Sequence, residues 1–262
     1  MPLTPIPQFD GQLSVVIPVK NEEDNIEPLI SEILQALGPE GANLERFEII
    51  YVDDGSTDQS LQRLISLRGQ LPLLKVIKHR WSCGQSAAVH TGVQAASFPW
   101  IATLDGDGQN DPFDLPHMIE QLRTQQLGDE SLVAVCGNRV RRHDDWLRRA
   151  SSRLANLARA SVLHDDTPDS GCGLKLFARN AYLELPFFNH SHRFLPALFR
   201  RQQRKVISIA VNHRPRTLGR SKYGLHNRLW AGLLDLVGVW WLNRRMTLPV
   251  TEALSSVSEP SS

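Results

Sequence analysis

The sequence of 262 residues has few cysteines, and they lie far apart along the chain. Cys83, Cys136 and Cys172 are odd in number and form no CxxC pair. A disulfide framework or a zinc site is therefore not expected, and a reducing compartment is favoured.

Long apolar segments and a leader pattern are also missing. The first residues, MPLTPIPQFDG, contain neither a basic nor an apolar segment, so they do not resemble a secretory signal. The most apolar stretch, Leu229–Leu242, has 14 residues and includes Asp235. Because a membrane-spanning helix needs about 20 apolar residues, this stretch favours a helix lying at a membrane surface. A helix buried in a dimer interface is the alternative.

The chain has no overall excess of either charge, with 29 Lys+Arg, 28 Asp+Glu and a net charge of +1. The neutral total hides a division: residues 1–138 hold 8 basic and 19 acidic residues (net −11), and residues 139–228 hold 19 and 6 (net +13). A nucleic-acid binder usually shows one dominant basic surface. An acidic half joined to a basic half suits a metal ion beside phosphates, although solvated helix faces that differ by chance would give the same count.

Strand and helix patterns alternate along a chain whose composition, 41% hydrophobic and 22% charged, is that of a folded globular protein. Helices are expected from a cap at Asn21, from a cap near Ser56 or Thr57, after Pro112, and over Ser86–Ala96, Trp146–Leu163, His192–Gln203 and Leu229–Leu242. Strands are expected over Leu13–Val19, Phe47–Val52, Leu73–Ile77, Trp100–Leu104, Leu132–Gly137, Leu174–Ala178 and Lys205–Val211. Repeated strand–helix units predict an α/β fold with a mainly parallel sheet and helices on both faces. Ligands of such sheets bind beyond the carboxyl ends of the strands.

Two acidic segments lie at that edge, each directly after a buried strand. In Asp105-Gly106-Asp107-Gly108-Gln109, two carboxylates separated by one small residue can approach one divalent cation. Oxygen ligands favour Mg²⁺ or Mn²⁺, which would also bridge phosphate oxygens. In Asp53-Asp54-Gly55-Ser56, a carboxylate can accept hydrogen bonds from a base or a ribose. The alternatives are a surface turn for the first segment and a helix cap for the second.

Three segments in order resemble the family 2 glycosyltransferases of the GT-A fold: Val16–Glu22, Val52–Ser56 and Leu104–Gln109. Three later segments resemble the polyprenyl-phosphate sugar synthase branch of that family, which includes enzymes like dolichol-phosphate mannose synthase: Gly137–Arg139, Asp169–Lys175 and Arg216–Tyr223. The likeness extends from about residue 13 to about residue 243. It implies a Rossmann-like GT-A domain.

The resemblance also implies a role for individual residues. Asp53 would meet the base, Asp54 the ribose or the neighbouring loop, and Asp107 the metal and the diphosphate. The nucleotide site would comprise Pro18, Asn21, Glu22, Asp53, Asp54, Gly84, Gln85 and Asp105, and the metal ligands would be Asp105, Asp107 and Gln109. Donor diphosphate and lipid phosphate would be held by Arg139, Arg216, Ser221 and Lys222, and the catalytic set would be Asp107, Arg139, Arg216 and Lys222. Ser82 departs from the family, where many relatives carry Asn.

The implied activity is inverting transfer of a sugar from a GDP- or UDP-linked donor to a polyprenyl phosphate, with Mg²⁺ or Mn²⁺ as cofactor. The enzyme would act on the cytoplasmic face of the membrane through peripheral contact, without nucleic acid. A phosphate acceptor is largely ionised at neutral pH, since its second pKa is around 6, so it hardly needs a general base. Two alternatives are a glycosyltransferase acting on a saccharide or protein hydroxyl, where Asp169 would serve as base, and a non-catalytic nucleotide-binding partner of a membrane complex.

The expected organisation is a GT-A domain followed by one helix. Residues 1–12 form an extension, residues 13–224 the domain, residues 225–246 an amphipathic interfacial helix and residues 247–262 a disordered tail. Within the domain, residues 13–138 form the nucleotide and metal half and residues 139–224 the acceptor half. The basic stretch Trp146–Arg153 and the tryptophans of the C-terminal helix are expected to face lipid headgroups.

Overall fold

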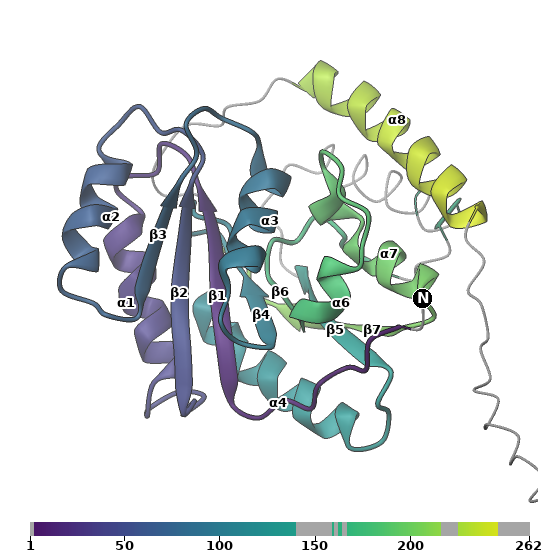
Figure 1. Ribbon diagram of the computed structural model, residues 1–262, viewed down its shortest axis with the longest axis horizontal. Coiled ribbons are helices and arrows are strands. Elements are labelled where there is room, and N and C mark those ends of the chain that lie inside the picture. Colours follow the sequence, from purple (N-terminus) through teal and green to yellow (C-terminus); the bar gives the residue numbers. More distant parts are fainter. Residues whose placement is uncertain (1–2, 140–158, 160–161, 164–166, 216–224, 246–262) are drawn as a thin grey trace, which may run out of the picture.

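A computed structural model describes residues 3–139, 159, 162–163, 167–215 and 225–245 (Figure 1). Its strands are β1 (Gln12–Val19), β2 (Arg46–Asp53), β3 (Leu74–Lys78), β4 (Trp100–Thr103), β5 (Leu132–Arg139), β6 (Lys175–Ala178) and β7 (Lys205–Val211). Its helices are α1 (Ile26–Leu37), α2 (Ser60–Arg68), α3 (Gln85–Ala95), α4 (Leu115–Gln126), α6 (Arg179–Leu183), α7 (Leu195–Arg201) and α8 (Leu225–Arg244), with short 3-10 turns at Pro112–Asp114 and Ser191–Arg193.

The strands form one mixed sheet in the order β3-β2-β1-β4-β6-β5-β7. β6 runs antiparallel to its neighbours β4 and β5, whereas β1 runs parallel to both β2 and β4. The chain therefore leaves β1 for β2 on one side and later returns to β4 on the other. This reversal of strand order beside β1 is the position at which open α/β sheets bind ligands.

Apolar residues at the spacing of each element explain how the sheet is covered. Residues 13–19 of β1 are buried throughout, which is typical of a central parallel strand. One face of α1 is buried through Ile26, Leu29, Ile30, Ile33, Ala36 and Leu37. Figure 1 shows α1 behind the strands β1–β3 and α3 in front of them, so the sheet is covered on both faces as predicted.

The two predicted helix caps were wrong, because their side chains join two loops. α1 begins at Ile26 after Asn25, whereas Asn21 lies in the left-handed region with φ of 50°. The Oδ1 atom of Asn21 accepts a hydrogen bond from Thr57 N at 2.7 Å, and Asn21 N donates to Ser56 Oγ at 2.9 Å. α2 then begins at Ser60. The polar residues thus fasten the loop after β1 to the loop after β2.

The helix predicted over His192–Gln203 was also wrong in its bounds. The structure has a 3-10 turn at Ser191–Arg193 and then α7 from Leu195 to Arg201. Pro196 explains the interruption, since proline fits the first turn of a helix but not its interior. The predicted helix Trp146–Leu163 lies outside the described residues except for positions 159, 162 and 163.

The C-terminal helix α8 is longer than the apolar stretch that predicted it, with 20 residues. Val239 is 1% exposed and packs in a small cluster with Leu163, Phe194, Ala197 and Leu198. Asp235 accepts a hydrogen bond from His190 Nδ1 at 2.8 Å. In the part of the chain that the structure describes, no helix combines the length and apolarity that a bilayer crossing requires.

Candidate active site

Both acidic segments lie against the end of β1. Asp54 N donates to the carbonyl of Val19 at 2.8 Å, which holds the segment after β2. A Cβ atom on Gly106 would lie 3.0 Å from the carbonyl oxygen of Pro18, so a side chain at Gly106 would push the loop after β4 away from β1. The parallel register of β1 with β2 and β4 therefore brings the predicted base site and the predicted metal site to one edge.

The carboxylate of Asp53 is fully buried, and only one of its two oxygens accepts a hydrogen bond. Its Oδ2 atom accepts a hydrogen bond from Ser56 N at 3.3 Å. Its Oδ1 atom has no hydrogen-bond partner among the described residues. A buried carboxylate oxygen without a donor is unfavourable, and an N–H group of a bound nucleobase would supply the missing bond. Because Asp53 is 0% exposed, a base could reach this oxygen only if the surrounding loops opened, so the role predicted for Asp53 stays a prediction.

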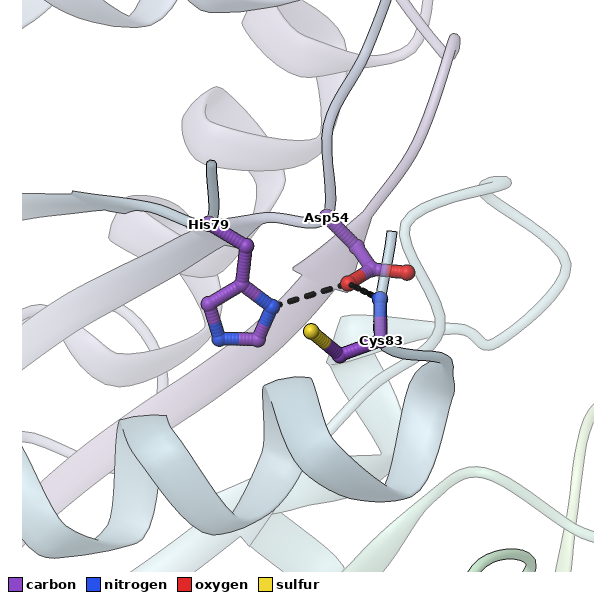
Figure 2. A group of neighbouring side chains, drawn as sticks. All are labelled: Asp54, His79 and Cys83. Atoms are coloured by element: carbon purple, nitrogen blue, oxygen red, sulfur yellow. Dashed lines mark hydrogen bonds and ion pairs between the residues drawn. The ribbon is translucent and has the colours of Figure 1, made fainter. Parts of the chain in front are cut away.

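Asp54 holds the neighbouring loop, which was one of its two predicted roles. His79 Nδ1 and Cys83 N lie 2.8 and 2.7 Å from Oδ1 (Figure 2), while Ser82 Oγ and Gly84 N donate to Oδ2 at 2.7 and 2.9 Å. Burial alone would raise the pKa of Asp54, but these hydrogen bonds lower it below its ordinary value. Ser82 thus contacts Asp54 through its hydroxyl.

Asp105 is held at the end of β4 by polar groups around it. Gln85 Nε2 donates to Asp105 Oδ1 at 2.7 Å, and Asp105 N donates to Asn110 Oδ1 at 2.8 Å. Burial, followed by the charge of Asp107, raises the pKa of Asp105 to about 6 against the opposing charge of Lys175. Two carboxylates that repel each other in a partly buried site fit a divalent cation, which would neutralise both.

The loop that carries Asp107 and Gln109 is fastened to the segment after β7. Gln109 N donates to Asp107 Oδ1 at 3.1 Å, and Arg214 N donates to the carbonyl of Gln109 at 3.0 Å. The guanidinium of Arg214 pairs with Glu32 and Asp111, each at 2.7 Å. Sequence reasoning gave Arg214 no role, because its partners lie more than 100 residues away in the chain.

Arg139 already has a carboxylate partner in the structure. Its Nε and Nη2 atoms donate to the two oxygens of Asp169 at 2.6 and 2.9 Å. Asp169 is 4% exposed. A bidentate pair of this kind fixes both side chains, so a phosphate contact by Arg139 would use Nη1 or the second N–H group of Nη2.

Two further residues belong to the site, although the sequence assigned them no firm role. Lys175 in β6 is buried, and its Nζ atom donates to the carbonyl of Cys172. His192 Nδ1 lies 2.6 Å from Ser86 Oγ, and burial, followed by the charges of Lys175 and Arg193, lowers the pKa of His192 well below its ordinary value. Asp105, Lys175 and His192 line one small cavity together with Gln85 and Pro18. Lys175 ends the segment Asp169–Lys175 that carried the family resemblance, and this is the signal that could have identified it.

Some of the remaining predicted residues lie in loops that the structure describes, and the others lie outside the described residues. Asn21 lies in the fastened loop described above, and Glu22 is nearly buried and accepts a hydrogen bond from Asn25 Nδ2 at 2.9 Å. Gly84, with φ of 90°, immediately precedes α3. The predicted acceptor residues Arg216, Ser221 and Lys222 lie outside the described residues.

A sheet with its strand order reversed beside β1, and with both acidic segments at that edge, has the arrangement expected of a glycosyltransferase of the GT-A type. The chain belongs to glycosyl transferase family 2, whose family model matches residues 14–185. The predicted fold class and family are thus confirmed.

Solved structures show the same fold. Glucosyl-3-phosphoglycerate synthase from Mycobacterium tuberculosis, in complex with Mn²⁺ and UDP, aligns with a TM-score of 0.64 at 19% identity over 88% of this chain and 79% of that chain. A mannosyltransferase from Pyrobaculum calidifontis, in complex with GDP-Man and Mn²⁺, gives 0.64 at 19% identity over 94% and 68%.

Curated relatives are more similar in sequence. The dodecaprenyl-phosphate galacturonate synthase of Rhizobium johnstonii is 34% identical over 242 residues, which is 91% of this chain and 69% of that protein. The undecaprenyl-phosphate 4-deoxy-4-formamido-L-arabinose transferase of Edwardsiella ictaluri is 32% identical over 81% of this chain and 63% of that protein. The chain thus spans about two thirds of the length of these relatives.

Proposed function

We propose that this family 2 glycosyltransferase moves a sugar from a nucleoside diphosphate donor to the phosphate of a polyprenyl phosphate. The names of the curated relatives support this acceptor class. The Arg139–Asp169 pair is the observation that favours a phosphate acceptor over a hydroxyl acceptor. A hydroxyl acceptor would need Asp169 as its base. A buried carboxylate held by both oxygens is poorly placed to take a proton, whereas a phosphate acceptor needs no such group.

The donor would lie across the end of β1. Asp53 would accept a hydrogen bond from the base once donor binding opens the loops that cover its Oδ1 atom, which has no hydrogen-bond partner among the described residues. Asp105, Asp107 and Gln109 offer an oxygen-only ligand set that fits Mg²⁺ or Mn²⁺. Such an ion, when bound, offsets the negative charge that develops on the diphosphate leaving group. Gln85 would orient Asp105 through the hydrogen bond at 2.7 Å.

The acceptor phosphate would attack from the basic half of the chain. One of its oxygens forms the new bond to the anomeric carbon while the bond to the nucleoside diphosphate breaks, so the anomeric configuration inverts. We assign Arg216, Ser221 and Lys222 to the binding of this phosphate, with Arg139 contributing through Nη1 or the second N–H group of Nη2. Lys175 and neutral His192 border the cavity beside Asp105 and would contact the transferred sugar.

The helix α8 would place this site at the membrane. Its described part exposes Leu234, Val237 and Trp241, and Arg244 lies over the ring of Trp240 at 4.5 Å. Figure 1 shows α8 on the side toward which β1 and β2 point. Tryptophan and arginine side chains are well suited to the headgroup region. Peripheral binding at the cytoplasmic face would let a lipid phosphate reach the edge that carries Asp105.

The proposal is tested by product analysis on the full chain. Undecaprenyl phosphate in mixed micelles is incubated with Mn²⁺ and each of a panel of UDP- and GDP-sugars, and the lipid is analysed by mass spectrometry. We expect a glycosylated lipid phosphate with one donor, and its loss both in EDTA and in Asp107→Ala, whose thermal melting should match the parent. Full activity in EDTA would remove the metal role. Donor binding without transfer to any lipid, saccharide or protein acceptor would favour a non-catalytic partner.

A further inference from the structure

A second cluster of ligating side chains lies beside the donor site but outside the all-oxygen set at Asp105 and Asp107. We propose that Asp54, His79 and Cys83 form a binding site for a soft divalent transition-metal ion, with Zn²⁺ as its preferred occupant. The ligating atoms of these three residues all lie within 4.8 Å of one another. Asp54 directly follows β2, and His79 and Cys83 lie near the two ends of the loop that joins β3 to α3.

The spacing of the carboxylate and the imidazole fits a shared ion. Asp54 Oδ1 and His79 Nδ1 are 2.8 Å apart. Two such atoms bound to one tetrahedral zinc ion lie about 3.3 Å apart, so the ion can replace the hydrogen-bonded proton after a small widening. Figure 2 shows the thiol of Cys83 next to this hydrogen bond.

The hydrogen-bond partners of His79 and Asp54 already hold these two side chains in an orientation that suits metal binding. His79 Nε2 lies 3.0 Å from Thr91 Oγ1 in α3, and metal-binding histidines commonly donate their second ring N–H to such an oxygen. Asp54 Oδ2 keeps the hydrogen bonds from Ser82 Oγ and Gly84 N, so Oδ1 can bind the ion without release of the loop. Binding of an ion would therefore keep the two hydrogen bonds to Oδ2 and replace the one between His79 and Oδ1.

The chemistry of the ligands selects the class of ion. Cys83 is exposed, whereas Cys136 and Cys172 are buried. Its thiol donates to the carbonyl of Trp81 at 3.4 Å, and it would leave this weak contact to turn toward the ion. On binding, the thiol proton leaves to solvent, and the imidazole binds in its neutral form with its proton on Nε2. Sulfur and imidazole ligands favour Zn²⁺ over Mg²⁺ and Mn²⁺. Three protein ligands leave a fourth position for water.

An ion in this cluster would add a further link between the residue after β2 and both ends of the loop between β3 and α3, which already meet through hydrogen bonds. Gln85 follows two residues after Cys83 and reaches Asp105 at 2.7 Å. The ion would therefore stiffen the loop that leads to the donor site. Sequence spacing did not reveal the cluster, because residues 54, 79 and 83 form no recognised zinc motif and are brought together by β2 and β3.

Cobalt spectroscopy on the metal-free full chain tests the site directly, because Co²⁺ bound to a thiolate gives a charge-transfer band that an all-oxygen site does not give. We expect this band on addition of one equivalent of Co²⁺, and its loss when Zn²⁺ is added. Cys83→Ser should abolish it, and His79→Gln should weaken Co²⁺ binding at least tenfold. Asp107→Asn is the matched control and should keep the band while it loses transfer, so the two sites fail independently.

A thermal melt with and without Zn²⁺ supplies a second measurement. Zn²⁺ should raise the melting temperature of the parent and of Asp107→Asn, since an ion that binds the folded state stabilises it by mass action, and should leave Cys83→Ser unchanged. The proposal is overturned if the parent shows no thiolate band, or if the band persists in Cys83→Ser and so arises from another cysteine.

Discussion

Asp53 and Asp54 are neighbours in sequence, yet their carboxylates have different surroundings. Asp53 keeps one buried oxygen without a donor among the described residues, whereas both oxygens of Asp54 accept hydrogen bonds from the loop before α3. The first arrangement suits a ligand and the second suits a structural anchor. The same residue type therefore serves binding at one position and loop placement at the next.

These surroundings predict that the same substitution impairs nucleotide binding at one position and folding stability at the other. Asp53→Asn should weaken binding of the preferred nucleotide at least tenfold, because an amide accepts less well than a carboxylate, while the fold is kept. Asp54→Asn should lower the free energy of unfolding by about 1–3 kcal/mol, because donors in the loop lose a charged acceptor. Calorimetric titration with UDP and GDP and urea unfolding measure the two effects. Equal loss of nucleotide binding with unchanged stability in both variants would contradict the distinction.

The Arg139–Asp169 pair predicts a large effect on stability. Arg139→Ala leaves a buried carboxylate without its partner, which should lower the free energy of unfolding by about 3–5 kcal/mol. The double variant Arg139→Ala/Asp169→Ala should recover part of that stability without recovering transfer. Urea unfolding of the parent, both single variants and the double variant measures the coupling. Additive effects of the two substitutions would show that the pair contributes little.

His192 predicts how stability changes in mild acid. Its pKa is well below the ordinary value of about 6.5 because of burial and nearby positive charge. The unfolded chain therefore binds a proton that the folded chain refuses, so stability falls as pH drops below about 6.5 and continues to fall toward the lower folded pKa. In a plot of the urea unfolding midpoint against pH, His192→Gln should have a smaller slope than the parent in this pH range. An unchanged slope between pH 7 and pH 5 would show that His192 titrates normally in the fold.

At the scale of elements, the strands were predictable and several helix limits were not. A buried parallel strand is apolar along its length, so the predicted Leu13–Val19 lies within one residue of β1. Helix starts depend on which partner a polar side chain finds. Asn21 and Ser56 resemble caps in sequence, but in the structure they bind the opposite loop. That choice is made by tertiary contacts between β1 and β2, which no local pattern contains.

The helix α8 predicts a membrane contact that can be separated from the fold. Leu234 and Trp241 are 74% and 54% exposed, so Leu234→Glu/Trp241→Glu should fold normally and weaken binding to phosphatidylglycerol vesicles by about tenfold or more. Leu127→Glu is the matched control, because Leu127 is 89% exposed and directly follows α4. Co-sedimentation measures binding, and salt should release part of the bound parent protein. If the double variant sediments like the parent but loses self-association in analytical ultracentrifugation, the exposed face of α8 is a dimer interface instead.

At the scale of the whole molecule, the position of the site was predicted mainly from the places of the two acidic segments along the chain. Alternating strand and helix patterns indicate a parallel sheet, and both Asp53 and Asp105 follow strands, so their placement at one edge followed from topology. The contacts that complete the site did not follow. Arg214 reaches Asp111 across 103 residues, and Lys175 approaches Asp105 because the antiparallel strand β6 pairs with β4. Such contacts depend on packing between elements rather than on spacing within them.

The central claim is that the acceptor is a phosphate. The most direct measurement offers the full chain equal amounts of undecaprenyl phosphate and undecaprenol, with its preferred nucleotide sugar and Mn²⁺, and quantifies both lipid products by mass spectrometry. The account predicts glycosylation of the phosphate alone, because an ionised phosphate oxygen attacks without a base and Asp169 is bound on both oxygens by Arg139. Glycosylation of undecaprenol at a comparable rate would contradict it, since a neutral hydroxyl would then be activated by a group that the account does not contain.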